Sequence, residues 1–170
     1  MYSTKDTIKP ITITKATQSY KNCKFHKING LRLQTDKFRL PYDYSEKFNK
    51  ITITMPVENT TVYDNIQMEV IRALHKLDID SQNLQLIKNG RIYLVINDRT
   101  VFFDKDKTPI KHDDGIDMLL RGTSIRCILA FKSICEYNSG CSYKINVDQI
   151  QILDSRFNNC DFDDINLWEG

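Results

Sequence analysis

Hydrophobic and polar residues alternate along several segments of the chain, which is the pattern of strands that bury one face. The segment KITITM, residues 50–55, places isoleucine and methionine on one side and threonine on the other. The same alternation runs through residues 123–137 and resumes over residues 141–153. We therefore predict one strand near residue 50, and two long paired strands joined by a turn at 138–140.

Shorter alternating runs and one turn motif predict further strands. Residues 1–50 contain alternating stretches rich in isoleucine and leucine, so we expect one or two strands there. Asn89-Gly90 lies between two alternating runs, and this dipeptide readily adopts the positive φ angles that a two-residue hairpin turn requires. The sequence therefore predicts a β-hairpin at about 84–96, followed by a strand in RTVFFD, residues 99–104.

The spacing of hydrophobic residues changes to a helical period over residues 64–77, where four of them lie on one side of a helix. Asp64 followed by Gln67 is typical of an N-terminal capping arrangement. A shorter helix is expected at about 114–121, closed by Gly122. The stripe on the main helix consists of Ile66, Val70, Leu74 and Leu77.

Many strands with two helices place the chain in the β-rich α+β class, and favour an antiparallel barrel or an α+β sheet over a parallel fold. With 170 residues and 41% hydrophobic content, the chain can bury one core. We expect a single β-rich domain over residues 1–153, of which about 1–30 form an N-terminal extension. Residues 154–170 form a C-terminal tail.

The charges are unevenly distributed, although the net charge is only +2. The tail is acidic at about −4, which leaves about +6 on the rest of the chain. An acidic tail with aromatic residues can occupy a basic groove of its own chain or dock on a partner protein, whereas the simpler interpretation is a solubilising end. The tail residues with this partner or autoinhibitory role would be Phe162, Asp163, Asp164 and Trp168.

Catalytic signatures are absent from the sequence: it has no glycine-rich phosphate loop, HExxH, GxSxG or paired CxxC motif. We therefore expect no enzymatic activity and no cofactor. No apolar run is long enough to cross a bilayer, and the first residues do not form a secretory signal. Five cysteines, an odd number, indicate free thiols in a reducing compartment, so we expect a cytoplasmic or nuclear protein.

Two groups of residues have the chemistry of metal ligands, and each has a simpler interpretation. Cys135 and Cys141 flank the turn at 138–140, and with Cys23 and His26 they would be the candidates for zinc, but buried thiols are favoured. Five aspartates suggest a metal-dependent nuclease, but lysines are interleaved with them, which favours a solvated loop, and we expect no metal site. These aspartates are Asp104, Asp106, Asp113, Asp114 and Asp117.

Basic and aromatic residues are interleaved along the strands predicted after residue 90. Cations bind phosphates by displacing counterions, and exposed rings stack on unpaired bases, so this combination is typical of surfaces that bind single-stranded nucleic acid. Lysine and tyrosine also mix on ordinary sheet faces, and some rings must be buried: Phe131, and either Phe102 or Phe103. The candidate nucleic-acid-binding residues are Arg91, Tyr93, Lys105, Arg126, Lys132, Tyr137, Tyr143 and Lys144.

The segment at residues 115–153 resembles the C-terminal region of single-stranded-DNA-binding proteins of large cytoplasmic DNA viruses, of the poxvirus and African swine fever virus type. The similar features are a short helix or loop, a strand with a basic residue near its start, a turn containing glycine, and a final strand of alternating apolar residues. The poxvirus members also end in an acidic tail with aromatic residues. The matching positions are Gly122, Arg126, Ile134, Gly140, Tyr143, Ile150 and Ile152.

The resemblance implies an antiparallel OB-fold-like barrel that coats single-stranded DNA at a cytoplasmic site of viral replication. We therefore expect a non-catalytic, sequence-tolerant single-stranded DNA-binding protein of viral DNA replication, repair or recombination, with RNA as a second ligand to test. The tail would contact replication proteins, no membrane contact is expected, and homo-oligomers are left open. The alternative is a ubiquitin-like (β-grasp) protein-interaction module at 50–120, because strand, helix and hairpin follow one another there in the β-grasp order.

Overall fold

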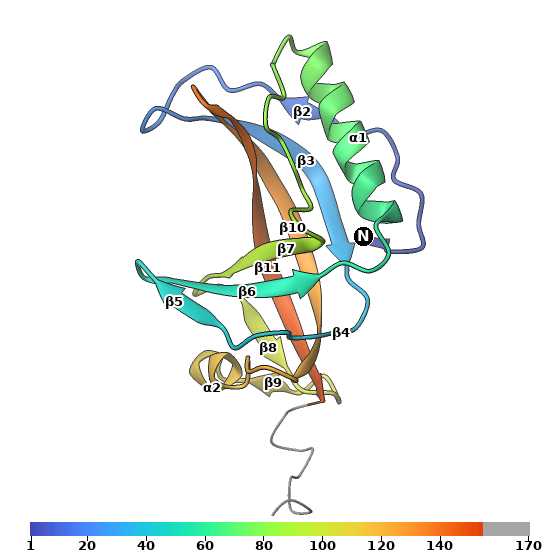
Figure 1. Ribbon diagram of the computed structural model, residues 1–170, viewed down its shortest axis with the longest axis vertical. Helices are drawn as coiled ribbons and strands as arrows, with labels where there is room; N and C mark the ends of the chain where they lie inside the picture. Colours follow the sequence, from blue (N-terminus) through green and yellow to red (C-terminus); the bar gives the residue numbers. More distant parts are fainter. Residues whose placement is uncertain (155–170) are drawn as a thin grey trace, which may run out of the picture.

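A long, curved hairpin runs through the molecule in the computed structural model, which describes residues 1–154 (Figure 1). Its two strands, β10 (Ser124–Tyr137) and β11 (Gly140–Asp154), pair antiparallel. A third long strand, β3 (Lys24–Gln34), pairs antiparallel with the other edge of β10. The two long paired strands predicted from the alternation over residues 123–153 are thereby confirmed.

Three further strands continue the sheet on the other side of β11. β7 (Arg91–Ile96) runs parallel to β11, where Val95 pairs with Asn146. β6 (Lys50–Pro56) and β5 (Ser45–Lys47) follow in antiparallel pairings, and β6 confirms the strand predicted in KITITM. β6 and β7 cross in front of the long hairpin in Figure 1, so the sheet bends strongly between β11 and β7.

Short strands extend the edges of this sheet. β1 (Tyr2–Ser3) and β2 (Ile13–Thr14) both pair with β3, and β4 (Phe38–Arg39) pairs with the start of β10. β8 (Val101–Phe103), within the strand predicted in RTVFFD, lies parallel to β11 and pairs with β9 (Pro109–Ile110). The N-terminal segment that we expected to be an extension thus contributes β1, β2 and the beginning of β3 to the sheet.

The main helix, α1 (Thr61–Lys76), lies beside β2 and β3 at one end of the molecule (Figure 1). Ile66, Val70 and Leu74 are buried under it, which confirms the apolar stripe predicted from the sequence. Leu77 follows the last helical residue and is partly buried against the same core. The apolar stripe of α1 therefore covers the core at that end of the molecule, while the polar side of the helix faces water.

The start of α1 differs from the prediction. The helix begins three residues earlier than expected, and the side-chain Oδ1 of Asn59 accepts a hydrogen bond from the backbone N–H of Thr61. Asp64 lies within the first turn rather than at the cap, and Gln67 donates a hydrogen bond from Nε2 to the carbonyl of Leu84. The capping arrangement inferred from Asp64 and Gln67 is therefore wrong, because tertiary contacts occupy the glutamine.

The second helix, α2 (His112–Asp117), packs on β8 at the opposite end of the molecule (Figure 1). It begins and ends earlier than the predicted helix at 114–121. A Cβ atom at Gly115 would lie 2.3 Å from Cγ of Phe102, so this contact requires glycine. Of the two rings considered from the sequence, Phe102 is the buried one, and Phe131 is also fully buried, as predicted.

The sheet is mixed rather than antiparallel, which corrects one part of the predicted fold. β1, β7 and β8 all run parallel to a neighbouring strand. Within residues 1–154 the strand order runs from β1 to β5, with no pairing between these two end strands, so closure into a barrel is not observed. The β-rich α+β class with two helices is confirmed, whereas alternation of residues could not reveal the direction of pairing.

The hairpin predicted at 84–96 forms only in part. Asn89 and Gly90 make the expected turn, with φ angles of 54° and 72°. The residues before the turn add no strand to the sheet, because both edges of β7 are occupied by β6 and β11. Leu84 and Leu86 of this segment are instead buried in the core. The turn chemistry was therefore predicted correctly, but the strand partner was not.

Candidate nucleic-acid interface

The side chains of β3, β10 and β11 that point away from the core form one open surface, which we call the outer face. Alternation along β10 changes at a bulge between Phe131 and Ser133, so both Lys132 and Ser133 lie on the outer side between the buried Phe131 and Ile134. The outer face consists of Phe25, Lys27, Arg32, Gln34, Arg126, Ile128, Lys132, Ser133, Tyr137, Ser142, Lys144, Asn146, Asp148, Gln149 and Gln151.

The outer face carries a strong excess of positive charge. Its one carboxylate is Asp148, whose Oδ2 lies 3.2 Å from a guanidinium nitrogen of Arg32, and both side chains are part-exposed. The pair therefore adds little stability, but Arg32 neutralises the one carboxylate of the outer face, which would otherwise repel a polyanion. The cations of the outer face are Lys27, Arg32, Arg126, Lys132 and Lys144.

Exposed rings lie among these cations near the turn of the long hairpin. The ammonium nitrogen of Lys144 lies 5.5 Å from the centre of the Phe25 ring, which is a cation–π arrangement. Phe25 is 37% exposed, and Tyr137 at the end of β10 is 45% exposed. An exposed ring beside a cation offers a surface for an unpaired base together with a charge for its phosphate.

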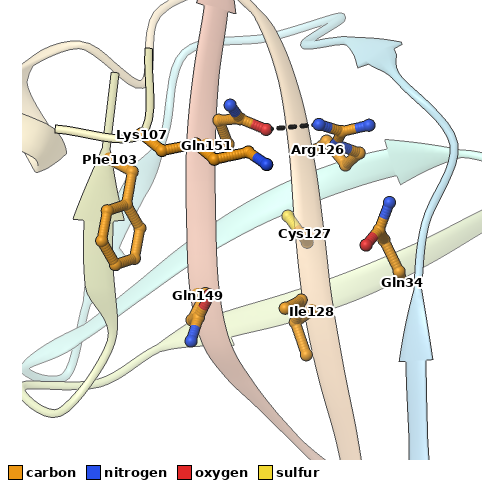
Figure 2. A pocket seen from close by; sticks show the side chains of 8 residues that line it. All are labelled: Gln34, Phe103, Lys107, Arg126, Cys127, Ile128, Gln149 and Gln151. Atoms are coloured by element: carbon orange, nitrogen blue, oxygen red, sulfur yellow. Dashed lines mark hydrogen bonds between the residues drawn. The ribbon is translucent and has the colours of Figure 1, made fainter. Parts of the chain in front are cut away.

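A pocket of about 450 Å³ lies at the other end of the outer face, beside β8 (Figure 2). Arg126 on β10 donates a hydrogen bond from Nη2 to Oε1 of Gln151 on β11, at 2.6 Å. Phe103 of β8 and Lys107 of the following turn form the opposite wall, so four separate chain segments contribute to the pocket. Of the predicted binding residues, only Arg126 lines it.

The outer face continues from β11 onto β7. Asn146 pairs with Val95, and Arg91 and Tyr93 lie on the same side of β7 as Val95. The Arg91 guanidinium lies 5.2 Å from the centre of the exposed Tyr42 ring. The hydroxyls of Tyr42 and Tyr93 raise the pKa of the Arg91 guanidinium further above its ordinary value. This second group of rings and one cation extends the candidate interface by one strand.

The eight residues predicted from the sequence are thus only partly brought together. One group lies on the outer face, a second on its continuation over β7, and Lys105 is exposed in the turn between β8 and β9, where its carbonyl accepts a hydrogen bond from Nε2 of Gln151. The first group is Arg126, Lys132, Tyr137 and Lys144, and the second is Arg91 and Tyr93.

Tyr143, the remaining predicted residue, points into the molecule. Its hydroxyl donates a hydrogen bond to Oε1 of Gln67 on α1, and its ring meets Phe131 edge-on. Burial raises the pKa of the Tyr143 hydroxyl well above its ordinary value. The Tyr143 side chain is partly buried against the core and lies on the side of the sheet away from the outer face, so we exclude it from the candidate interface. The sequence held a signal for this, since Tyr143 shares its parity with Cys141 and Ile145.

Two of the residues considered as metal ligands, His26 and Asp104, hold local structure through hydrogen bonds. Over residues 1–154 no three His, Cys, Asp or Glu side chains come together in a group that could hold a metal ion. His26 is fully buried, accepts a hydrogen bond at Nδ1 from the Ala16 N–H, and donates from Nε2 to Glu136. Oδ1 of Asp104 accepts hydrogen bonds from two backbone N–H groups, and thereby fixes the turn between β8 and β9.

Two further expectations concern membrane contact and the C-terminal tail. In the part of the chain that the structure describes, no helix has the length and hydropathy needed to span a membrane. The tail residues Phe162, Asp163, Asp164 and Trp168 lie outside the described residues.

The fold is shared with single-stranded DNA-binding proteins of known structure. The protein of bacteriophage Enc34 in complex with ssDNA has a TM-score of 0.52 and 12% identity, over 86% of this chain and 97% of that chain. Its C-terminal truncation has a TM-score of 0.50 and 14% identity, over 86% and 96%. A further structure of the same phage protein has a TM-score of 0.50 and 14% identity, over 91% and 99%.

At these identities the similarity establishes the fold alone. It extends over most of the chain, whereas the resemblance noted in the sequence covered only the C-terminal half. The resemblance to the poxvirus and African swine fever virus type stays a prediction. No protein-family model matches the chain, and no curated protein matches it either.

Proposed function

We propose that this protein binds single-stranded DNA through its outer face, without catalysis and without a requirement for a particular base sequence. The observation that carries the proposal is the gathering of five cations on one open sheet surface, where the only carboxylate is already paired with Arg32. Such a surface attracts a polyanion and releases counterions when phosphates bind.

The exposed rings favour a single strand over a duplex. Phe25 and Tyr137 are both exposed, and Phe25 lies beside the ammonium group of Lys144. A ring can stack only on a base that is not already paired and stacked. Phosphates would lie along Arg126, Lys132 and Lys144. The Enc34 protein, which has the same fold, has been solved with ssDNA, and this supports the choice of ligand.

The finer features of the proposal follow from this activity. The fold would be an OB-like arrangement used in viral DNA replication, repair or recombination, at a cytoplasmic site of replication or in the nucleus. Residues 1–153 would act as one binding domain, and the acidic tail would recruit replication proteins or compete for the outer face. Binding of RNA and self-association are open to the same assays.

The β-grasp alternative finds less support in the arrangement of strands. β6, α1 and β7 do follow one another in the order that this alternative requires. However, β7 also pairs with β11, so residues 50–120 share one continuous sheet with the long hairpin rather than forming a separate unit. A module of that kind would have no affinity for nucleic acid, and the assay below separates the two hypotheses.

The proposal is tested by the salt dependence of binding to labelled oligo-dT of about 16 nucleotides, the upper end of the site size of OB-fold proteins. We compare the wild type with the double variant Lys132→Gln/Lys144→Gln by fluorescence anisotropy. Each lost phosphate contact should make the slope of log affinity against log salt less steep by about 0.7, so the double variant should lose about 1.4.

A matched control changes the net charge equally on another side of the molecule. Lys9 and Lys76 are exposed, and neither belongs to the outer face. The double variant Lys9→Gln/Lys76→Gln should keep the slope and affinity of the wild type. Equal losses in both double variants would show that only the total charge matters, and a wild-type affinity independent of salt would overturn the proposal.

A further inference from the structure

The pocket beside β8 is built from two neighbouring rows of paired residues, so its shape is fixed by the sheet itself. In the first row, Ile128 pairs with Gln34 on one side and with Gln149 on the other. In the second row, Gln151 pairs with Arg126 and with Phe103. Side chains held at such positions are better ordered than side chains on loops, which suits a site that must fit one flat ligand.

The three glutamines of the pocket differ in their hydrogen bonding. Both ends of the Gln151 amide are occupied, since Oε1 accepts from Arg126 and Nε2 donates to the carbonyl of Lys105. The amides of Gln34 and Gln149 have no hydrogen-bond partner among the described residues, and both side chains are half-buried. Each therefore offers a donor and an acceptor to whatever enters the pocket.

The remaining walls provide a ring and positive charge. Phe103 is partly exposed, and its ring lies at the side of the pocket opposite Ile128 (Figure 2). Lys107 is exposed at the rim, and Arg126 has further N–H groups besides the one that binds Gln151. The volume of about 450 Å³ lies in the range of sites for small organic ligands.

From these features we infer that the pocket is a subsite for a single unpaired nucleobase, stacked on Phe103, with its polar edge against the amides of Gln34 and Gln149. Lys107 and Arg126 bind the adjoining phosphates. A free amide can turn either its donor or its acceptor toward a base, so the subsite accepts bases of different kinds. The inference rests on the proposed binding of single-stranded DNA, and it assigns one step of that binding to one place.

The test compares oligo-dT with an oligonucleotide of the same length whose bases are replaced by abasic spacers. The variant Phe103→Leu removes the ring and keeps apolar bulk, and it should weaken binding to oligo-dT about tenfold, as expected for the loss of one stacked base. Gln149→Leu should weaken it about fivefold, since one hydrogen bond is lost. Neither change should affect binding to the abasic oligonucleotide, whose phosphates still meet the cations.

The control variant Tyr20→Leu removes a ring that is 62% exposed and does not line the pocket, and it should leave both affinities unchanged. Thermal melting confirms that each variant is folded. If Phe103→Leu weakens both oligonucleotides equally, or neither, the nucleobase subsite is refuted while the binding of single-stranded DNA stands. If the wild type binds neither oligonucleotide, the proposed function fails first.

Discussion

The hydrogen bond between Tyr143 and Gln67 gives a direct test of the position of Tyr143. The hydroxyl of Tyr143 on β11 donates to Oε1 of Gln67 on α1, and Nε2 of Gln67 donates to the carbonyl of Leu84 at 2.6 Å. One side chain thus connects the helix, the long hairpin and the segment that follows the helix. The change Tyr143→Phe removes only the hydroxyl and leaves Oε1 of Gln67 without its donor.

The expected loss of stability follows from this burial. A part-buried acceptor that loses its partner costs about 1–3 kcal/mol, out of a total stability of about 5–15 kcal/mol. The melting temperature of a domain of this size should therefore fall by about 2–4 °C for each kcal/mol lost. Tyr93→Phe is the matched control, because Tyr93 is 52% exposed and a surface change of this kind costs less than about 0.5 kcal/mol.

Urea unfolding of both variants, followed by circular dichroism, measures these differences. A second comparison adds Gln67→Leu, alone and combined with Tyr143→Phe, so that the coupling between the two side chains is obtained directly. If Tyr143→Phe costs no more than Tyr93→Phe, or if the coupling is zero, then Tyr143 is not held inside the molecule and its exclusion from the interface is mistaken.

Three further predictions concern the core. Gly115→Ala should lower the free energy of unfolding by about 1–3 kcal/mol in urea titrations, because the new Cβ meets the Phe102 ring; an unchanged midpoint would contradict this contact. Thr100→Val should cost about 1–3 kcal/mol in the same assay, since the buried hydroxyl donates to a backbone carbonyl of β11; a neutral result would show that water replaces it. Burial raises the pKa of the Tyr63 hydroxyl and the Cys127 thiol, so the folded state keeps protons that the unfolded state releases. Stability is then complete below about pH 8 and falls as pH rises past about 9–10, and a urea midpoint that stays constant over that range would refute this.

Local patterns in the sequence were sufficient for the elements that depend on local contacts. The alternation over residues 123–153 predicted β10 and β11, and KITITM predicted β6, because one face of each strand is buried. The helical period of Ile66, Val70 and Leu74 predicted α1 for the same reason. Asn89 and Gly90 were also interpreted correctly, since a turn is decided by the residues within it.

The candidate site was predicted less completely, because it depends on which strands become neighbours. The alternation of Gln149 and Gln151 with buried isoleucines shows that both glutamines face outward, but nothing local shows that β8 lies parallel beside them. Phe103 was recognised only as one of two rings of which one must be buried. The pocket was therefore missed, although its individual side chains were assigned to strands.

The pairing of β3 with β10 has a consequence for biosynthesis. About 90 residues separate the end of the first strand from the start of the second, and a ribosome that adds about 5–20 residues per second needs on the order of 5–20 s to supply them. During that interval the edge of β3 that later pairs with β10 lacks its partner strand and can pair with other chains. Most of the polypeptide must therefore be synthesised before β3, which already has the short strands β1 and β2 beside it, pairs with another long strand.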